Sequence, residues 1–212
     1  MADGREYIYL NETELTAMLA AVGVPAWYGP AAENAVRIQT REDVNRILAE
    51  LYLKEVLDWD EENAVISGMA GDAVGIIKNA DVCILTGQQH EQELEYIYPS
   101  DGRLVQIAVS LREEKKLRLT VLSFEEWMEK LEEKTFFPEI IGSIQADDSI
   151  HSDAACSVME LRSTLTGEII SQIHIIDQGA YGTIYLTSPD VQRTYICSRD
   201  HYERILREWT EA

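Results

Sequence analysis

Residues 93–123, with the sequence ELEYIYPSDGRLVQIAVSLREEKKLRLTVLS, decide the fold class. Apolar and polar side chains alternate in this stretch, as at Leu94, Tyr96 and Tyr98, and a period of two residues is typical of β-strands. The Asp-Gly pair at 101–102 indicates a tight turn, and the charged run at 112–116 indicates a second one. The stretch therefore predicts three antiparallel strands at about 93–98, 104–111 and 117–122.

Helical patterns surround these strands. Asn11 followed by Glu14 has the form of a helix N-cap with its acidic partner, and apolar residues then recur three and four positions apart. Ser123 is a similar cap for a helix that follows the strands directly. Together with a short strand at 7–10, we expect helices at 11–23, 41–57, 63–79, 123–134 and 199–211.

The second part of the chain resembles the first at an offset of 75 residues. At that offset Val109, Leu111, Val121, Ser123, Trp127 and Leu131 correspond to Ile184, Leu186, Ile196, Ser198, Tyr202 and Leu206. This predicts an internal duplication, with halves at about 1–134 and 158–212 joined by a connector at 135–157. We expect one α+β domain over 1–212, in which the strands of both halves form one antiparallel sheet with helices beside it.

The charge of the chain limits its partners. Among 212 residues there are 18 Lys and Arg against 38 Asp and Glu, a formal net charge of −20. Nucleic acids and anionic membrane surfaces are bound through clustered Lys and Arg, so we expect neither as a partner. The three cysteines form no paired motif, and residues 1–10 hold no continuous apolar stretch, so we expect a cytoplasmic protein.

No motif for catalysis or cofactor binding stands out. The glycines at 68, 71 and 75 do not have the spacing of a phosphate-binding loop, and no histidine belongs to a zinc-binding motif. The cluster Asp147, Asp148, His151 and Asp153 could in principle hold a divalent ion, but acidic connectors are common in so acidic a chain. We therefore expect no catalytic residues, no metal and no cofactor.

The order of elements, with three short segments, resembles the EspG-type chaperones of ESX (type VII) secretion systems. The segments are YLNETEL at 9–15, LDWD at 57–60 and QGAYGTIYL at 178–186. The resemblance implies a central antiparallel sheet, flanking helical bundles and two pseudo-symmetric halves. It further implies a non-enzymatic protein that binds a secreted protein substrate in the cytoplasm. This chain is shorter than the mycobacterial members, which leaves the identity of the partner open.

The same resemblance implies where the partner binds. In that family the loop between the second and third strands and the C-terminal helical bundle contact the substrate. Here the loop corresponds to Pro99, Ser100, Asp101, Gly102 and Arg103, and the bundle includes Tyr202 and Trp209 of the helix at 199–211. A plain hairpin turn and a core-facing aromatic pair are the alternatives for these residues.

The alternative function for the whole protein is that of an acidic immunity protein, which neutralises a secreted, basic toxin.

Overall fold

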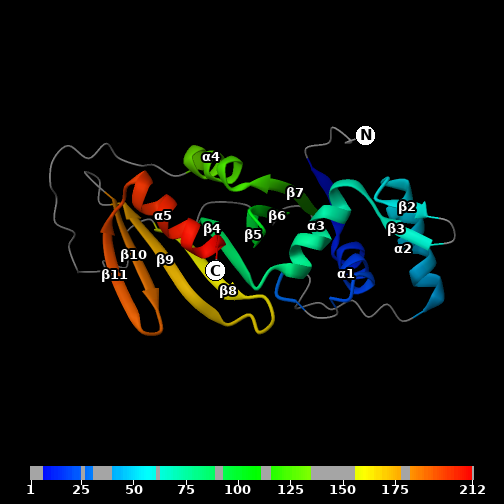
Figure 1. Cartoon of the computed structure of the whole chain (residues 1–212), viewed down its shortest axis with the longest axis horizontal. Coiled ribbons are helices and arrows are strands. Elements are labelled where there is room, and N and C mark those ends of the chain that lie inside the picture. Colours follow the sequence, from blue (N-terminus) through cyan, green and yellow to red (C-terminus); the bar gives the residue numbers. More distant parts are fainter. Residues whose placement is uncertain are drawn as a thin grey trace.

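A nine-stranded antiparallel sheet runs through the computed structural model (Figure 1), which describes residues 7–24, 27–30, 40–60, 63–88, 93–110, 116–134, 156–177 and 182–211. Its order is β1-β7-β6-β5-β4-β8-β9-β10-β11, and β2 and β3 form a separate hairpin. The strands are β1 Ile8–Asn11, β2 Leu57–Asp60, β3 Asn63–Ile66, β4 Val82–Gln88, β5 Glu93–Ser100, β6 Arg103–Ser110, β7 Lys116–Ser123, β8 Cys156–Ser163, β9 Ile169–Asp177, β10 Gly182–Ser188 and β11 Val191–Ile196. The helices are α1 Glu12–Ala21, α2 Arg41–Leu53, α3 Gly68–Asn79, α4 Phe124–Lys134 and α5 Arg199–Thr210.

The large sheet consists of two four-strand meanders joined at its centre. β4 to β7 pair in chain order and lead into α4, and β8 to β11 pair in chain order and lead into α5. The meanders meet where β4 pairs with β8, with Ile84 opposite Leu161, and β1 adds one strand beside β7. The chain is therefore α+β with a central antiparallel sheet, while a common origin of the two meanders stays a prediction.

The strands expected at 93–98, 104–111 and 117–122 are confirmed as β5, β6 and β7. The turn between β5 and β6 places Asp101 at φ 50° and Gly102 at φ 73°. Positive φ at both central residues is what a two-residue hairpin turn of this hand requires, and Asp-Gly supplies it at low steric cost. The Asp-Gly pair therefore fixes the register between β5 and β6.

Two expected helices have the wrong bounds. The helix expected at 41–57 ends at Leu53, because Glu55 adopts φ 58° and turns the chain into β2. The helix expected at 63–79 begins only at Gly68, whose φ of 57° interrupts any helix running through it. Residues 63–66 form β3 instead, paired with β2 in the hairpin.

Two strands of the sheet were not expected at all. β4 has the continuous apolar run Val82–Leu85, which lacks the alternation of a half-buried strand because both of its faces are covered. β8 begins at Cys156, inside the connector expected at 135–157; residues 135–155 lie outside the described part of the chain.

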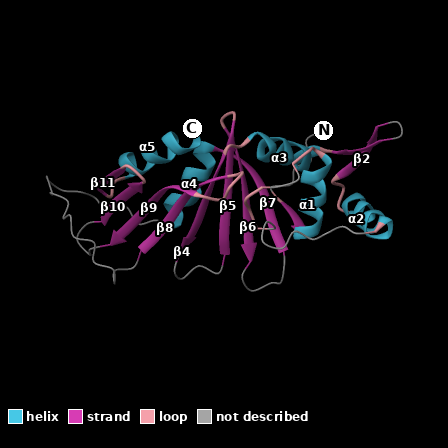
Figure 2. Cartoon of the chain, turned by 90° about the horizontal axis from the view of Figure 1, so that it is seen from below, coloured by secondary structure: helices cyan, strands magenta, loops and turns pink. Residues whose placement is uncertain are grey.

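The two faces of the sheet support two separate cores. Neighbouring residues divide between them: Cys83, Tyr98 and Val105 belong to one cluster, and Ile84, Ile97 and Leu104 to the other. Successive side chains of a strand point to opposite faces. The first cluster includes residues of α1, α2 and α3, and the second includes residues of α4 and α5. Helices thus cover both faces, and in Figure 2 the strands fan out between them.

The helix ends follow the sequence signals closely. Asn11 and Glu14 form the reciprocal capping box at α1, and Ser123 and Glu126 form another at α4. Backbone and side-chain hydrogen bonds from Ser123 lower the pKa of the Glu126 carboxyl. None of the helices in the described ranges combines the length and the apolar character needed to cross a membrane.

Candidate functional site

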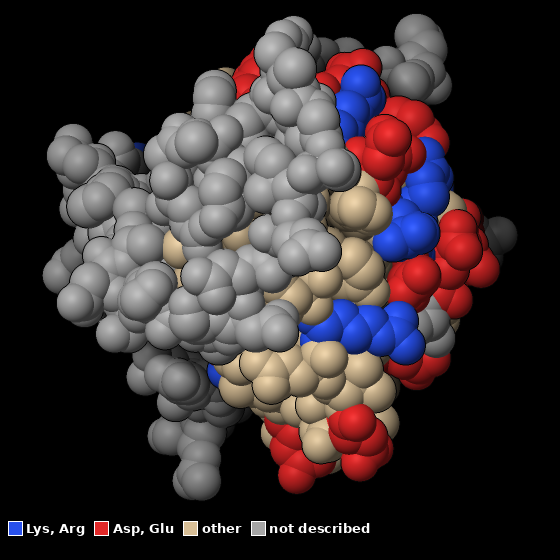
Figure 3. Space-filling model, turned by 90° about the vertical axis from the view of Figure 1, so that its left-hand side faces the viewer, with Lys and Arg blue, Asp and Glu red and all other residues tan. Residues whose placement is uncertain are grey.

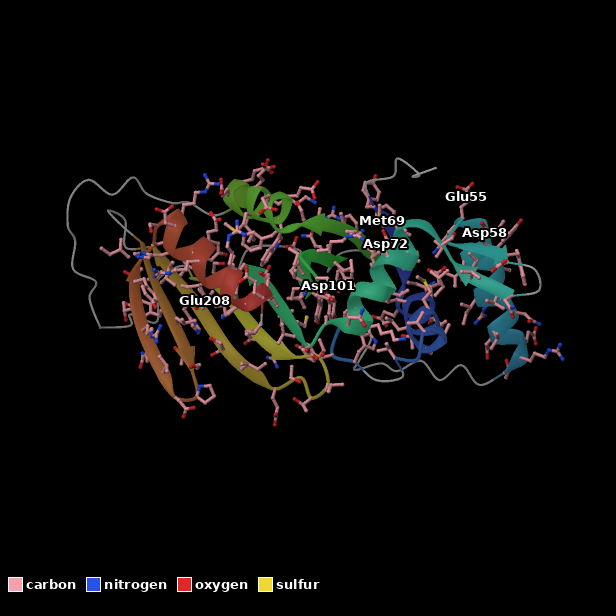
Figure 4. All side chains as sticks on the ribbon, in the orientation of Figure 1. Glu55, Asp58, Met69, Asp72, Asp101 and Glu208 are labelled. Atoms are coloured by element: carbon pink, nitrogen blue, oxygen red, sulfur yellow. The ribbon has the colours of Figure 1, made fainter. Side chains whose placement is uncertain are left out.

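The residues at 99–103, which are expected to contact a partner, line a cleft of about 540 Å³. Asp101 and Gly102 form the tip of the β5–β6 turn, and Figure 4 shows Asp101 between α3 and α5. Arg103, at the start of β6, donates to Asp72 of α3 over 2.8 Å. Both side chains of this pair are about half exposed, so it orients the turn more than it stabilises the fold.

The opposite wall of the cleft is built from the start of α4 and the end of α5. Phe124 and Glu125 come from α4, and Arg207 and Thr210 come from α5. The Arg207 guanidinium lies 4.2 Å from the centre of the Phe124 ring and 2.8 Å from a Glu203 carboxylate oxygen. The hydrogen bond to Glu203 raises the pKa of Arg207, and it also fixes the position of the guanidinium at this wall.

The two aromatic residues expected to bind a partner lie in the core behind this cleft. Tyr202 is fully buried and donates its hydroxyl hydrogen to Met159 Sδ over 3.1 Å. Trp209 is also buried, among the residues that pack between α5 and the sheet. The structure therefore brings the turn at 99–103 together with the last turn of α5, but the Tyr202 and Trp209 rings face the sheet.

The loop at 99–103 does not lie between the second and third strands of the chain. β2, β3 and β4 precede β5 in the chain, so residues 99–103 join the fifth and sixth strands. The second and third strands are those of the small β2–β3 hairpin. The sequence signal for this hairpin is the alternation in LDWD at 57–60, where the sequence analysis predicts the end of a helix.

Acidic side chains predominate in the cleft. Among the described residues that line it, Asp81, Asp101, Glu125 and Glu211 are acidic, and Arg103 and Arg207 are basic. Charges of both signs continue along α5 from the cleft, where Asp200, Glu203, Arg204, Arg207 and Glu208 line one shallow depression. Figure 3 shows this mixture of acidic and basic side chains along one side of the molecule's β11 end. The cleft suits a group with a net positive charge.

A second candidate surface lies where α2 packs beside β2, at the right-hand end of the molecule in Figure 1. We call it the α2–β2 surface and define it by Tyr52, Leu53 and Trp59. Each exposes more than half of its side chain, and Leu53 exposes 81%. On α2 the core positions are Ile47 and Leu51, so Tyr52 and Leu53 fall outside the core-facing stripe. Glu55 and Asp58 lie at the same end (Figure 4).

Sequence reasoning missed the α2–β2 surface because it placed these residues within a helix and an acidic turn. Trp59 stands opposite Ala64 in the hairpin, so no large side chain of β3 covers it. Val65 is exposed on the other face of the hairpin, opposite Asp58. The exposure of Trp59 could have been inferred only from the hairpin register.

Cys83 and Cys197 offer little reactivity. Burial raises the pKa of the Cys83 thiol from 9.0 to about 12, and the Cys197 thiol is also buried. Within the described ranges no group of three or more His, Cys, Asp or Glu side chains is placed to hold a metal ion. The cluster at 147–153 lies outside those ranges.

Comparison with models of protein families found no match, and comparison with curated protein sequences found none either.

Proposed function

We propose that this protein is a non-enzymatic cytoplasmic chaperone or adaptor that binds a secreted, helical protein substrate of a type VII (ESX-like) secretion system. The observation that carries the proposal is the α2–β2 surface. Tyr52, Leu53 and Trp59 expose large apolar side chains on neighbouring elements. Covering such side chains contributes roughly 25 cal/mol per Å² of apolar area, and exposed groups of this kind mark interaction sites.

The resemblance to EspG-type chaperones supplies the class of partner. The order of elements supports it: a strand and helices come first, and a sheet followed by a C-terminal helix comes last. The pairing of β4 with β8 between two meanders supports the further proposal that the sheet consists of two pseudo-symmetric halves. A chaperone of this class needs a surface that shields apolar parts of its substrate from water, and the α2–β2 surface is suited to that task.

Acidic residues beside the α2–β2 surface favour a partner with flanking basic residues. Glu55 and Asp58 lie at its margin, and Asp60 follows on β2. Complementary charge around an apolar contact selects the correct partner and accelerates association. We therefore expect the substrate to place an apolar helical segment on Leu53 and Trp59, with Lys or Arg beside it.

The alternative is an immunity protein that blocks a basic toxin. The net charge of −20 and the acidic cleft at the β5–β6 turn favour this reading. The two functions differ in what they do to a cell. An immunity protein rescues a cell that produces the toxin encoded beside it. A chaperone keeps a secreted protein dissolved and is not expected to protect a cell from a toxin.

Capture from the native host, followed by mass spectrometry, identifies the partner. The capture is run in parallel with wild-type protein, with Leu53→Asp, and with Leu165→Asp as the matched control. Leu165 lies in the β8–β9 turn and is 82% exposed, nearly the same as Leu53. We expect a helical secreted protein that is retained by the wild type and the control and lost from Leu53→Asp. Recovery of metabolic enzymes alone, or equal recovery by all three proteins, contradicts the proposal.

A further inference from the structure

The strand β11 forms one edge of the large sheet, at the left-hand end of the molecule in Figure 1. It pairs with β10 along its whole length, and none of the strands in the described part of the chain pairs with its other side. Natural sheets usually protect such an edge with proline, lysine, a bulge or a very short strand. β11 has six residues in regular register with β10, contains neither proline nor lysine, and carries Arg193 as its one charged residue.

The hydrogen bonds to β10 determine which backbone groups of β11 face outward. The Cys197 N–H donates to the Gly182 carbonyl on β10 over 2.7 Å. Backbone groups of successive residues in a strand point to opposite sides. The outward-facing residues are therefore Gln192, Thr194 and Ile196. The Ile196 carbonyl oxygen also lies 3.1 Å from His201 Nδ1, and its second lone pair allows it to accept from a strand as well.

The outer side of β7, at the other end of the sheet, shows that a strand fits in this kind of position. β7 and β11 are each the last strand of a four-strand meander, and each leads directly into a helix on the same face of the sheet. β1 pairs along the outer side of β7, with Tyr9 opposite Arg118. The helix α4 therefore leaves room for a strand beside β7. We expect α5 to leave the same room beside β11.

The outward-facing residues of two β11 strands match each other in a symmetric antiparallel register. When Thr194 stands opposite Thr194 of a second copy, Gln192 stands opposite Ile196 and Arg193 stands opposite Tyr195. Opposed threonines are among the favourable cross-strand pairs. A register centred on Arg193 would align the backbone groups equally well, but it would place two arginines directly opposite each other, which is unfavourable. The register centred on Thr194 is therefore preferred.

This register reproduces the pairing between β1 and β7. At the offset of 75 residues Arg118 of β7 corresponds to Arg193 of β11. Arg118 stands opposite Tyr9, and Arg193 would stand opposite Tyr195 of the second copy. In both cases the residue after the tyrosine is a large aliphatic one. A second copy of β11 thus offers the same side chains to this edge as β1 offers to β7.

The distribution of charge also favours contact between two copies at this end. The whole chain has 18 basic and 38 acidic residues, so two copies repel each other over most of their surfaces. Residues 189–211, which include β11 and α5, hold four arginines and five acidic residues. Figure 3 faces this end of the molecule and shows the basic and acidic side chains interspersed. Two copies can therefore meet here with little repulsion.

We propose that two copies of this chain form a dimer through β11, paired antiparallel about Thr194, so that one sheet continues through both. The two-fold axis is perpendicular to the sheet, and both α5 helices lie on the same face. Such a contact uses the same surface on both copies and closes after two of them. It lies on a different part of the chain from the α2–β2 surface, so its test is independent of the chaperone proposal.

Disulfide crosslinking of the full chain tests the register. In Thr194→Cys the two introduced thiols stand opposite each other, with Cα atoms about 5.5 Å apart, a distance that a disulfide spans. Gln192→Cys also faces outward on β11 but stands opposite Ile196, and it is the matched control. We expect Thr194→Cys to form the crosslinked dimer at least about tenfold faster than Gln192→Cys, because proximity favours the reaction. The wild type measures the background from the native cysteines.

Sedimentation over a series of concentrations tests the association itself. Thr194→Lys places two ammonium groups opposite each other and should raise the dissociation constant of the dimer at least about tenfold. Thr187→Lys is the matched control, because Thr187 lies one strand further in and pairs with Gln192 on the same face. It should dimerise as the wild type does. Thermal melts followed by circular dichroism verify that both variants are folded.

Four results would overturn the inference. The first is a wild type that stays monomeric up to about 0.5 mM, where a dissociation constant of even about 1 mM gives detectable dimer. The second is equal crosslinking of Thr194→Cys and Gln192→Cys. The third is a dimer that folded Thr194→Lys does not weaken. The fourth is assembly into open filaments, because pairing of β11 with β11 closes after two copies.

Discussion

Lys54 Nζ lies 2.6 Å from both carboxylate oxygens of Glu14, and this pair holds the end of α2 against the start of α1. The Glu14 side chain is 1% exposed, whereas that of Lys54 is 37% exposed. Glu14 also accepts from the Asn11 backbone N–H as part of the capping box. One buried carboxylate thus joins the start of α1 to the segment that carries the α2–β2 surface.

Removing the charge of Lys54 leaves the Glu14 carboxylate buried without its cation. We expect Lys54→Met to lower the free energy of unfolding by about 2–3 kcal/mol, somewhat less than is usual for a broken buried pair because Lys54 is partly exposed. Arg46→Met, which breaks the exposed Arg46–Asp43 pair, should cost less than about 1 kcal/mol. Urea unfolding measures the loss of stability in both variants. Equal losses would show that the Glu14–Lys54 pair contributes no more to stability than the exposed Arg46–Asp43 pair.

The same substitution at two glycines should have opposite effects. Gly102→Ala places a side chain at φ 73° in the β5–β6 turn and should destabilise the protein by about 1 kcal/mol. Gly75→Ala lies in the interior of α3, where an added methyl group meets no atom within 4 Å, and should stabilise it by up to about 1 kcal/mol. Thermal unfolding measures both. A destabilised Gly75→Ala would mean that α3 packs more closely than described.

The sequence predicted the sheet best where local signals and burial agree. The alternation around Leu94 and the Asp-Gly turn identified β5 and β6, because a half-buried strand leaves a period of two. It failed at β4, since a strand covered on both faces has no alternation, and at 57–66, where short strands resemble helix ends. Asp101 and Gly102 were correctly predicted to form a turn, whereas Pro99 and Ser100 belong to β5 and Arg103 belongs to β6. Tyr202 and Trp209 were found on α5, but periodicity alone does not distinguish a core aromatic from one that faces a partner.

Stability should fall in alkaline solution, in part because of Cys83. Burial raises the pKa of this thiol in the folded protein from 9.0 to about 12, so the unfolded chain loses the proton first. The folded state therefore retains a proton that the unfolded state has lost between about pH 9 and 12, and stability declines as the pH rises through that window. Burial also raises the pKa of Tyr98, which adds to the decline.

Cys83→Ala tests the contribution of the thiol directly. We expect its free energy of unfolding to fall less steeply above pH 9 than that of the wild type, whatever its stability at neutral pH. Denaturant unfolding at several alkaline pH values measures the slope. If both proteins show the same slope, the thiol ionises alike in the folded and unfolded states.

The salt dependence of binding separates the two proposed functions. The free energy gained by burying apolar area changes little between low and moderate salt. A partner held on the α2–β2 surface should therefore lose less than about tenfold in affinity when the salt concentration is raised. Charge reversal at Asp101 or Arg103 should then matter less than loss of Leu53. A basic toxin attracted by the net charge of −20 should instead bind with a steep dependence on salt. Calorimetry at two salt concentrations distinguishes these outcomes.

The most direct test of the chaperone proposal is the affinity of the captured partner for Leu53→Asp and for Leu165→Asp. The two leucines are 81% and 82% exposed, so neither substitution should change the stability of the fold. Calorimetric titration should show an affinity at least about tenfold lower for Leu53→Asp, as expected for a central apolar contact, and an unchanged affinity for Leu165→Asp. Wild-type affinity for Leu53→Asp, or an equal loss in both variants, would contradict the assignment of the α2–β2 surface as the binding site.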